Sequence, residues 1–187
     1  MHATWNTLGA SSKDKLVRKF YFMFLAVALS ACADSHQLMR MGGSAAKLDP
    51  QGKVFVSVPN DGRHNQTTYY GSGLNTAQIV VLAFSQRAKK VESGHHYQDF
   101  DSALAAAQKA STMYLVVPTI LEWEDRATEW SGIPDKASIS LAVVNTVTGA
   151  TIDSAIIKGK SGLATFGGDH PQDLLPMPVG EYVNSLY

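Results

Sequence analysis

The apolar stretch Met113-Tyr114-Leu115-Val116-Val117 decides the fold, and it continues past Pro118 to about Trp123. A near-continuous apolar run of this kind predicts a central strand that is buried on both faces. Proline has no amide hydrogen to donate to a ladder. Pro118 is therefore expected at a bulge or beyond the paired part of the strand.

Two strands and two helices are predicted before this central strand. Each is bounded by turn residues or by a residue that can cap a helix. They are a strand over Val54–Val58 that Pro59-Asn60-Asp61-Gly62 ends, a helix from about Gly73 to Lys90 with Ser72 as its cap, a short strand over Val91–Ser93, and a helix from Asp99 or Asp101 to Ala110.

Two further strands and a helix are predicted after it. Ala137–Val144 and Thr151–Lys158 form a hairpin, and Gly149 in the connecting turn can take a positive φ. Pro178 can open the last helix at its first position. The apolar stripe of that helix is Val179, Tyr182, Val183 and Leu186.

The order of these elements predicts the fold class. Strands that alternate with helices pair in parallel, and a late hairpin adds antiparallel pairing. We expect one α/β domain over residues 53–187, with a mixed sheet of four or five strands covered by helices. Residues 32–52 are rich in Ala, Ser and Gly and are expected to be a lipidated N-terminus followed by a flexible tether.

The segment before the tether has the pattern of a bacterial lipoprotein signal. Basic residues Lys15, Arg18 and Lys19 precede about 12 mostly apolar residues, which end in Leu29-Ser30-Ala31-Cys32. This pattern is a lipobox. It predicts cleavage between Ala31 and Cys32 and lipidation of Cys32, the only cysteine. The apolar run is short of the ~20 residues of a membrane-spanning helix.

Cleavage would leave 156 of the 187 residues, with 12 basic and 15 acidic side chains and no disulfide. This balance of charge does not indicate a nucleic-acid-binding protein, which would carry a basic surface. No polybasic patch follows the anchor in the sequence, so the acyl chains alone are expected to hold the protein on the membrane. The region before the apolar segment would be 19 residues long, whereas a typical signal begins with a short one. This length suggests a translation start at Val17 rather than at Met1.

The densest polar and aromatic stretch is Glu122-Trp123-Glu124-Asp125-Arg126-Ala127-Thr128-Glu129-Trp130. Its carboxylates and tryptophans could bind a sugar polymer, and a carboxylate pair could hydrolyse glycans. The alternative is an ordinary strand end. In that interpretation Glu122, Glu124 and Arg126 face solvent, and Trp123 and Asp125 point inward or along a rim.

Three further motifs give weaker functional signals. The loop Thr165–Pro171 contains the neighbours Asp169 and His170, which suit a tight turn better than catalysis because no nucleophile motif accompanies them. Gly71-Ser72-Gly73 is expected to start a helix rather than to bind an anion. His95-His96 lacks further ligands at useful spacing, so a solvated loop is favoured over a metal site. No metal or cofactor is predicted.

Two longer motifs carry a family resemblance. Residues 123–132 (WEDRATEWSG) and 164–176 (ATFGGDHPQDLLP), with the ending Tyr182-Val183-x-x-Leu186-Tyr187, resemble an uncharacterised family of proteobacterial lipoproteins known as a domain of unknown function. The resemblance covers about Val54 to Tyr187 and implies no activity. The element order is also similar to the curli-secretion lipoprotein and to the activators of penicillin-binding proteins.

These observations favour a non-enzymatic lipoprotein that is anchored in the outer membrane and faces the periplasm. Ala33 follows the anchor, and the aspartate that retains many lipoproteins in the inner membrane is absent from that position. Asp34 stands one place later, so the inner membrane is the less favoured alternative. The expected role is binding or assembly with an envelope protein or glycan, and the oligomeric state is left open. The expected surface comprises Trp123, Glu124, Arg126, Trp130, Asp169 and His170. The alternative is a glycan hydrolase that uses carboxylates of residues 122–129.

Overall fold

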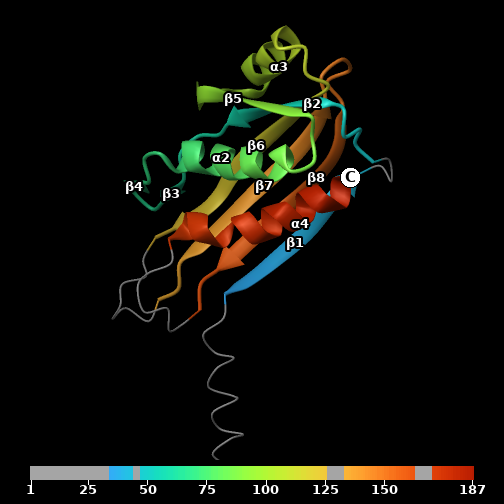
Figure 1. Cartoon of the computed structure of the whole chain (residues 1–187). Coiled ribbons are helices and arrows are strands. Elements are labelled where there is room, and N and C mark those ends of the chain that lie inside the picture. Colours follow the sequence, from blue (N-terminus) through green and yellow to red (C-terminus); the bar gives the residue numbers. More distant parts are fainter. Residues whose placement is uncertain (1–33, 44–46, 126–132, 163–169) are drawn as a thin grey trace, which may run out of the picture. The chain divides into compact units, whose positions relative to one another are not determined.

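The computed structural model describes residues 34–43, 47–125, 133–162 and 170–187. Strands and helices alternate in the first half of this domain, and strands β6, β7 and β8 follow one another in the second half (Figure 1). The elements are β1 (Ser35–Gly43), β2 (Lys53–Val58), β3 (Arg63–His64), β4 (Thr67–Thr68), α2 (Ser72–Ser85), β5 (Lys90–Tyr97), α3 (Phe100–Lys109), β6 (Tyr114–Glu124), β7 (Lys136–Asn145), β8 (Thr151–Lys160), a 3₁₀ helix (Pro171–Leu174) and α4 (Pro176–Leu186).

The main sheet has six strands in the order β1-β8-β7-β6-β2-β5. β2 pairs in parallel with β5 and β6, because α2 and α3 return the chain to the same end of the sheet. The pairs β6–β7, β7–β8 and β1–β8 are antiparallel. The predicted α/β class with one mixed sheet is confirmed, and the sheet has six strands rather than four or five.

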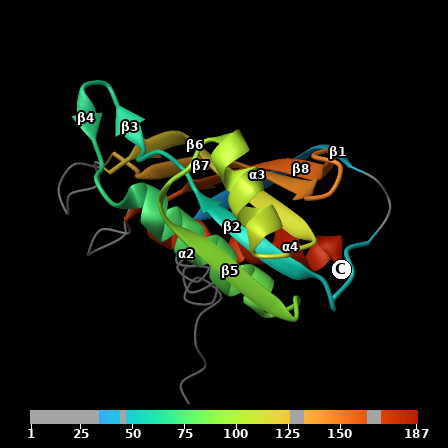
Figure 2. The ribbon, with the colours of Figure 1, turned by 90° about the horizontal axis from the view of Figure 1, so that it is seen from above.

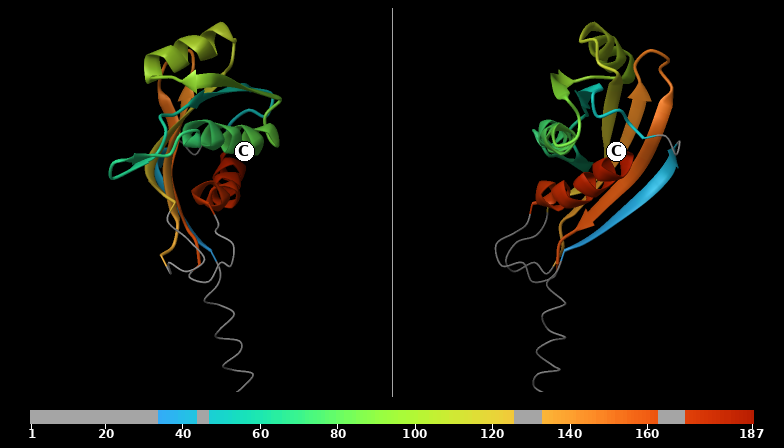
Figure 3. Two further views of the ribbon diagram at one scale, coloured as in Figure 1. Left: turned by 90° about the vertical axis from the view of Figure 1, so that its left-hand side faces the viewer. Right: turned by 45° about the vertical axis from the view of Figure 1, so that its right-hand side comes forward.

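The two faces of the sheet are covered unequally. Helices α2 and α4 lie on one face, and α3 lies on the other near one end of the strands (Figures 2 and 3). The larger core lies under α2 and α4 and includes Val56, Phe84, Ile139 and Tyr182. The smaller core lies under α3, where Phe55, Leu115 and Val144 surround Ala103 and Ala107. Within the described ranges, much of the second face of β7 and β8 is therefore left without a helix.

The predicted central strand is confirmed as β6. Tyr114 and Val116 belong to the larger core, and Leu115 belongs to the smaller one, so alternate side chains are buried on opposite faces. Pro118 lies opposite Leu141 in the ladder with β7, two residues beyond the last residue that pairs with β2. The bulge of this ladder falls between Ile120 and Glu122 instead.

The tether prediction for residues 32–52 is wrong over most of that range. Ser35–Gly43 forms strand β1, which pairs with β8 along its length. Leu48 is buried, and its amide donates to the Leu186 carbonyl at 2.8 Å. Ser35–Gly43 is thus an edge strand of the main sheet.

Several helix and strand boundaries also differ from prediction. Helix α2 ends at Ser85 rather than near Lys90, because the following turn brings the Lys89 amide to the Pro50 carbonyl (2.9 Å) at the start of β5. β5 then runs through Gly94 to Tyr97. Helix α4 begins at Pro176 rather than Pro178, directly after the 3₁₀ helix. Its predicted apolar stripe is buried.

Candidate functional site

The end of β6 carries the first half of the polar and aromatic motif. Trp123 is 2% exposed and lies in the core, where its Cβ faces Gly62. This placement corrects the expectation that Trp123 belongs to an exposed binding surface. The bulge between Ile120 and Glu122 sets the phase of the strand end, so that Trp123 pairs with Ala137 on the face of the larger core.

Glu124 is likewise buried, at 6% exposure, and does not face solvent as the strand-end interpretation expected. One carboxylate oxygen lies 3.3 Å from His64 Nδ1, and the other lies 3.6 Å from Lys136 Nζ. β3 supplies His64 and β7 supplies Lys136. The Glu124 carboxylate of β6 therefore contacts side chains of β3 and β7, and it is not available as a surface carboxylate.

The structure brings the two long motifs together through Asp125 and His170. His170 Nδ1 lies 3.3 Å from Asp125 Oδ2, although the two residues are 45 positions apart. The sequence favoured a tight turn for the adjacent Asp169 over a role as partner of this imidazole, and Asp169 lies outside the described residues. Asp173 also serves this turn, because its carboxylate accepts a hydrogen bond from the His170 backbone amide at 3.0 Å.

A polar hollow of about 340 Å³ surrounds this pair. It lies where β6 ends and α2 begins. Its lining combines two tyrosines, a carboxylate, an imidazole and amides: Tyr69, Tyr70, Ser72, Asn75, Trp123, Asp125, His170 and Gln172. Such a lining can bind a polar ligand by hydrogen bonds and stacking on the exposed ring of Tyr70.

Ser72 in this hollow has a structural role. Its buried Oγ accepts a hydrogen bond from the Gly62 amide at 2.7 Å. The predicted cap of α2 is also different, because Gly71 with φ 88° occupies the N-cap position. Asp61 accepts from the Gly73 amide at 2.8 Å and so satisfies this helix start. The carboxylate of Asp61 occupies the place that an anion would need.

The carboxylates proposed for glycan hydrolysis lie in different surroundings in the described structure. Asp125 lines the polar hollow, Glu122 lines a different hollow on the open face of the sheet, and Glu124 is buried in ion pairs. Glycosidases need two carboxyl groups on either side of one bond. Glu129 lies outside the described residues, as do Arg126, Trp130, Asp169, Ala31 and Cys32 of the predicted sites.

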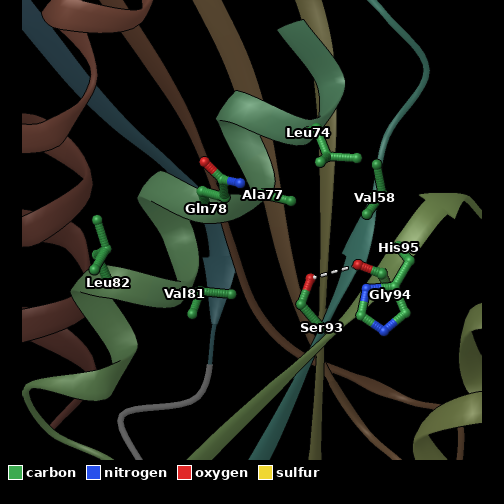
Figure 4. Close-up of a pocket in the computed structure, with 9 residues that line it drawn as sticks. All are labelled: Val58, Leu74, Ala77, Gln78, Val81, Leu82, Ser93, Gly94 and His95. Carbon is green, nitrogen blue, oxygen red and sulfur yellow. Dashed lines mark hydrogen bonds between the residues drawn. The ribbon is translucent and has the colours of Figure 1, made fainter. Parts of the chain in front are cut away.

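A second hollow lies between α2 and the edge strand β5, with a volume of about 440 Å³. Figure 4 shows the side chains of α2 and Val58 of β2 on one side and residues 93–95 of β5 on the other. Its lining is mostly apolar, and Leu82 is 67% exposed. His95 borders this groove. Over the described residues, no group of three His, Cys, Asp or Glu side chains is placed to hold a metal ion.

Comparison with known proteins places the chain in a family. The model of a domain of unknown function (DUF4823) matches residues 46–186. The chain belongs to this family. The resemblance drawn from the two motifs is thereby confirmed, and the family description assigns no activity. No curated protein matches the chain.

Solved structures show the same fold. The PelC dodecamer from Paraburkholderia phytofirmans is 14% identical, with a TM-score of 0.64 over 81% of this chain and 97% of that chain. Lipoprotein GNA1162 from Neisseria meningitidis is also 14% identical, with a TM-score of 0.49 over 71% of this chain and 96% of that chain. At 14% identity, the likeness to PelC shows a shared fold and nothing beyond it. None of the helices in the described ranges is long and apolar enough to cross a membrane.

Proposed function

We propose that this protein is a lipoprotein anchored through Cys32 in the outer membrane, and that its periplasmic domain is a non-enzymatic assembly module. The lipobox Leu29-Ser30-Ala31-Cys32 and the basic and apolar segments before it support the anchor. The alternative of a glycan hydrolase has less support, because the described carboxylates of residues 122–125 do not share a hollow.

The observation that carries the assembly role is the pair of open edges of the main sheet. β1 and β5 are its outermost strands, and each pairs with one neighbour. Edge strands offer unpaired amide and carbonyl groups to another chain, and monomeric proteins usually protect them with charges or proline. β1 has nine residues, no proline and one Lys or Arg side chain, Arg40.

The side chains of β1 favour a protein partner. Leu38, Met39 and Met41 are 37%, 39% and 63% exposed. Arg40 does not protect the edge from pairing, because its side chain turns to the α4 side. There Arg40 Nε lies 3.0 Å from Oδ2 of the buried Asp153 carboxylate. An exposed apolar edge strand of this length is typical of an interface.

The proposed partner is a second copy of this chain, with β1 of one copy adding to β5 of the next. Such a head-to-tail interface generates a ring when the rotation closes. The groove between α2 and β5 would receive apolar side chains of the incoming strand. The shared fold with PelC, which is described as a dodecamer, supports this choice of partner.

The test is the mass of the full chain extracted from its envelope in mild detergent, measured by native mass spectrometry. We expect a defined multimer. The double variant Met39→Lys/Met41→Lys is expected to be monomeric, because lysines on an edge strand oppose pairing. Val147→Lys is the matched control, because Val147 is 87% exposed in the β7–β8 turn. A monomeric wild-type protein, or a double variant that stays multimeric, would contradict the proposal.

A further inference from the structure

Three lysines gather at one end of the open face of the sheet. Lys136 is the first residue of β7, and Lys158 and Lys160 lie at the end of β8. The register places Lys136 and Lys160 opposite each other, with Ser35 of β1 beside Lys160. Together with neighbouring residues they line a hollow of about 260 Å³.

These lysines point away from α2 and α4. The residues between them face the larger core, because Ala137 belongs to it and Gly159 lies against Leu174. Helix α3 is on the same side as the lysines, but it packs on Leu115 and Val144 at the opposite end of the strands. No helix among the described elements covers the lysines, and Lys158 and Lys160 are exposed.

The charge of this cluster is only partly balanced. Lys136 lies 3.7 Å from Glu122 and 3.6 Å from Glu124. Within the ranges that the structure describes, Lys158 and Lys160 form no ion pair. Among the described residues, these two exposed ammonium groups thus have no carboxylate partner.

The short chain between the predicted anchor and β1 limits how far this cluster can lie from the membrane. Ser35, which lines the same hollow, is three residues after Cys32, a span of at most about 11 Å. The Asp34 carboxylate accepts from the Gly162 amide at 3.0 Å, so the start of β1 is held beside the end of β8. A lipid attached to Cys32 would bring the lysines to the headgroup layer of the membrane.

We propose that Lys158 and Lys160, assisted by Lys136, bind the phosphates of anionic phospholipid headgroups beside the anchor. The inference rests on the proposed lipidation of Cys32. The sequence showed no basic patch after the anchor because these lysines are more than 100 residues away in the chain. A basic surface near anionic lipid strengthens attachment roughly fivefold per lysine and supplies a second signal beside the acyl chains.

The test uses the full lipidated chain, reconstituted in vesicles of phosphatidylethanolamine alone or with phosphatidylglycerol. An amine-reactive reagent is applied, and labelling of each lysine is measured by mass spectrometry. We expect labelling of Lys158 and Lys160 to fall several-fold in the anionic vesicles and to recover in ~1 M salt, where the Debye length is about 3 Å. Lys109, exposed at the end of α3, is the internal control and should label equally in both vesicles.

The variant Lys158→Glu/Lys160→Glu adds a second measurement. In this variant the remaining lysine, Lys136, should be labelled equally in the two kinds of vesicle. The control variant Lys109→Glu should leave the protection of Lys158 and Lys160 from labelling intact. The mass of the N-terminal peptide reports the state of Cys32 in the same samples. Lipidated Cys32 with equal labelling of Lys158 and Lys160 in both vesicles overturns this inference and leaves the anchor standing. An unmodified Cys32 overturns both.

Discussion

Gly62 is fixed by the close approach of the β3 loop to the indole of Trp123. A Cβ at this position would lie 2.5 Å from Trp123 Cβ and 2.8 Å from Cγ, so the strand end or the loop would have to move. We expect Gly62→Ala to lower the free energy of unfolding by roughly 1–3 kcal/mol, the usual cost of overpacking a core. Urea denaturation followed by tryptophan fluorescence measures it.

Gly180 provides the matched control for this change. It lies inside α4, and a Cβ there would meet nothing within 4 Å. Gly180→Ala should raise the free energy of unfolding by about 1 kcal/mol, because alanine has the higher helix propensity. If both substitutions changed the free energy of unfolding in the same direction, the contact between Gly62 and Trp123 would not be the cause of the effect of Gly62→Ala.

Single residues also show where sequence patterns stop being informative. Alternation along the end of β6 suggested an exposed Glu124. Its side chain does lie on the face opposite Trp123, but it is buried there beside His64 and Lys136. The partner of His170 could not be found either. The neighbouring Asp169 was assigned to a tight turn, and tertiary folding supplies Asp125 from 45 residues away. Local patterns do not contain such contacts.

At the scale of elements, β1 is held to the domain by a buried polar network. Arg40 of β1 and the Tyr182 hydroxyl of α4 both donate to the Asp153 carboxylate of β8, at 3.2 and 2.9 Å. Asp153 is 2% exposed. Burial and the hydrogen bond to Asp153 raise the pKa of Tyr182. The tyrosine therefore remains a donor across the physiological range.

Arg40→Met should destabilise the protein by about 1–2 kcal/mol in the free energy of unfolding. The buried carboxylate would lose a charged donor, and the partial exposure of Arg40 lowers the cost below that of a buried pair. Chemical denaturation at neutral pH measures it. The control Arg63→Met, on the exposed end of β3, should change the value by less than about 0.5 kcal/mol. Equal effects would mean that the contact between Arg40 and Asp153 contributes nothing measurable to stability.

The composition of β1 could not have predicted this role. Ser35–Gly43 has neither the β-branched run of β2 nor the strict alternation of β7, and two glycines end it. β7 could be predicted because Ile139, Leu141 and Val143 alternate with small residues. β1 is a strand because β8 presents an edge to it and because α4 supplies partners for its polar side chains.

At the scale of the whole molecule, sequence order predicted the topology better than it predicted the surfaces. Helical connections gave the parallel pairs and the hairpin gave the antiparallel ones, since both follow from local patterns. The unequal covering of the two faces does not follow from them. It depends on where α2, α3 and α4 pack, and it leaves the lysine cluster without a helix over it among the described elements.

Tyr187, directly after α4, makes the stability of the whole fold depend on pH under alkaline conditions. Burial, and to a smaller extent the charges of Tyr114 and Asp49, raise the pKa of Tyr187 to about 12. The ring packs edge-on against Phe84 of α2, with centroids 6.4 Å apart. In the unfolded chain tyrosine ionises near pH 10, so the unfolded state releases this proton first. The stabilising contribution is complete below about pH 10 and is lost as pH rises through about 12.

We therefore expect the urea midpoint to stay level up to about pH 9 and to fall above about pH 10. Tyr187→Phe should reduce that fall, because phenylalanine cannot ionise and no described group bonds the Tyr187 hydroxyl. Tyr70→Phe is the control, because the side chain of Tyr70 is 90% exposed and its removal should leave the alkaline fall unchanged. Equal falls in wild type and Tyr187→Phe would show that the contact between α4 and α2 tolerates a charged ring, which its burial argues against.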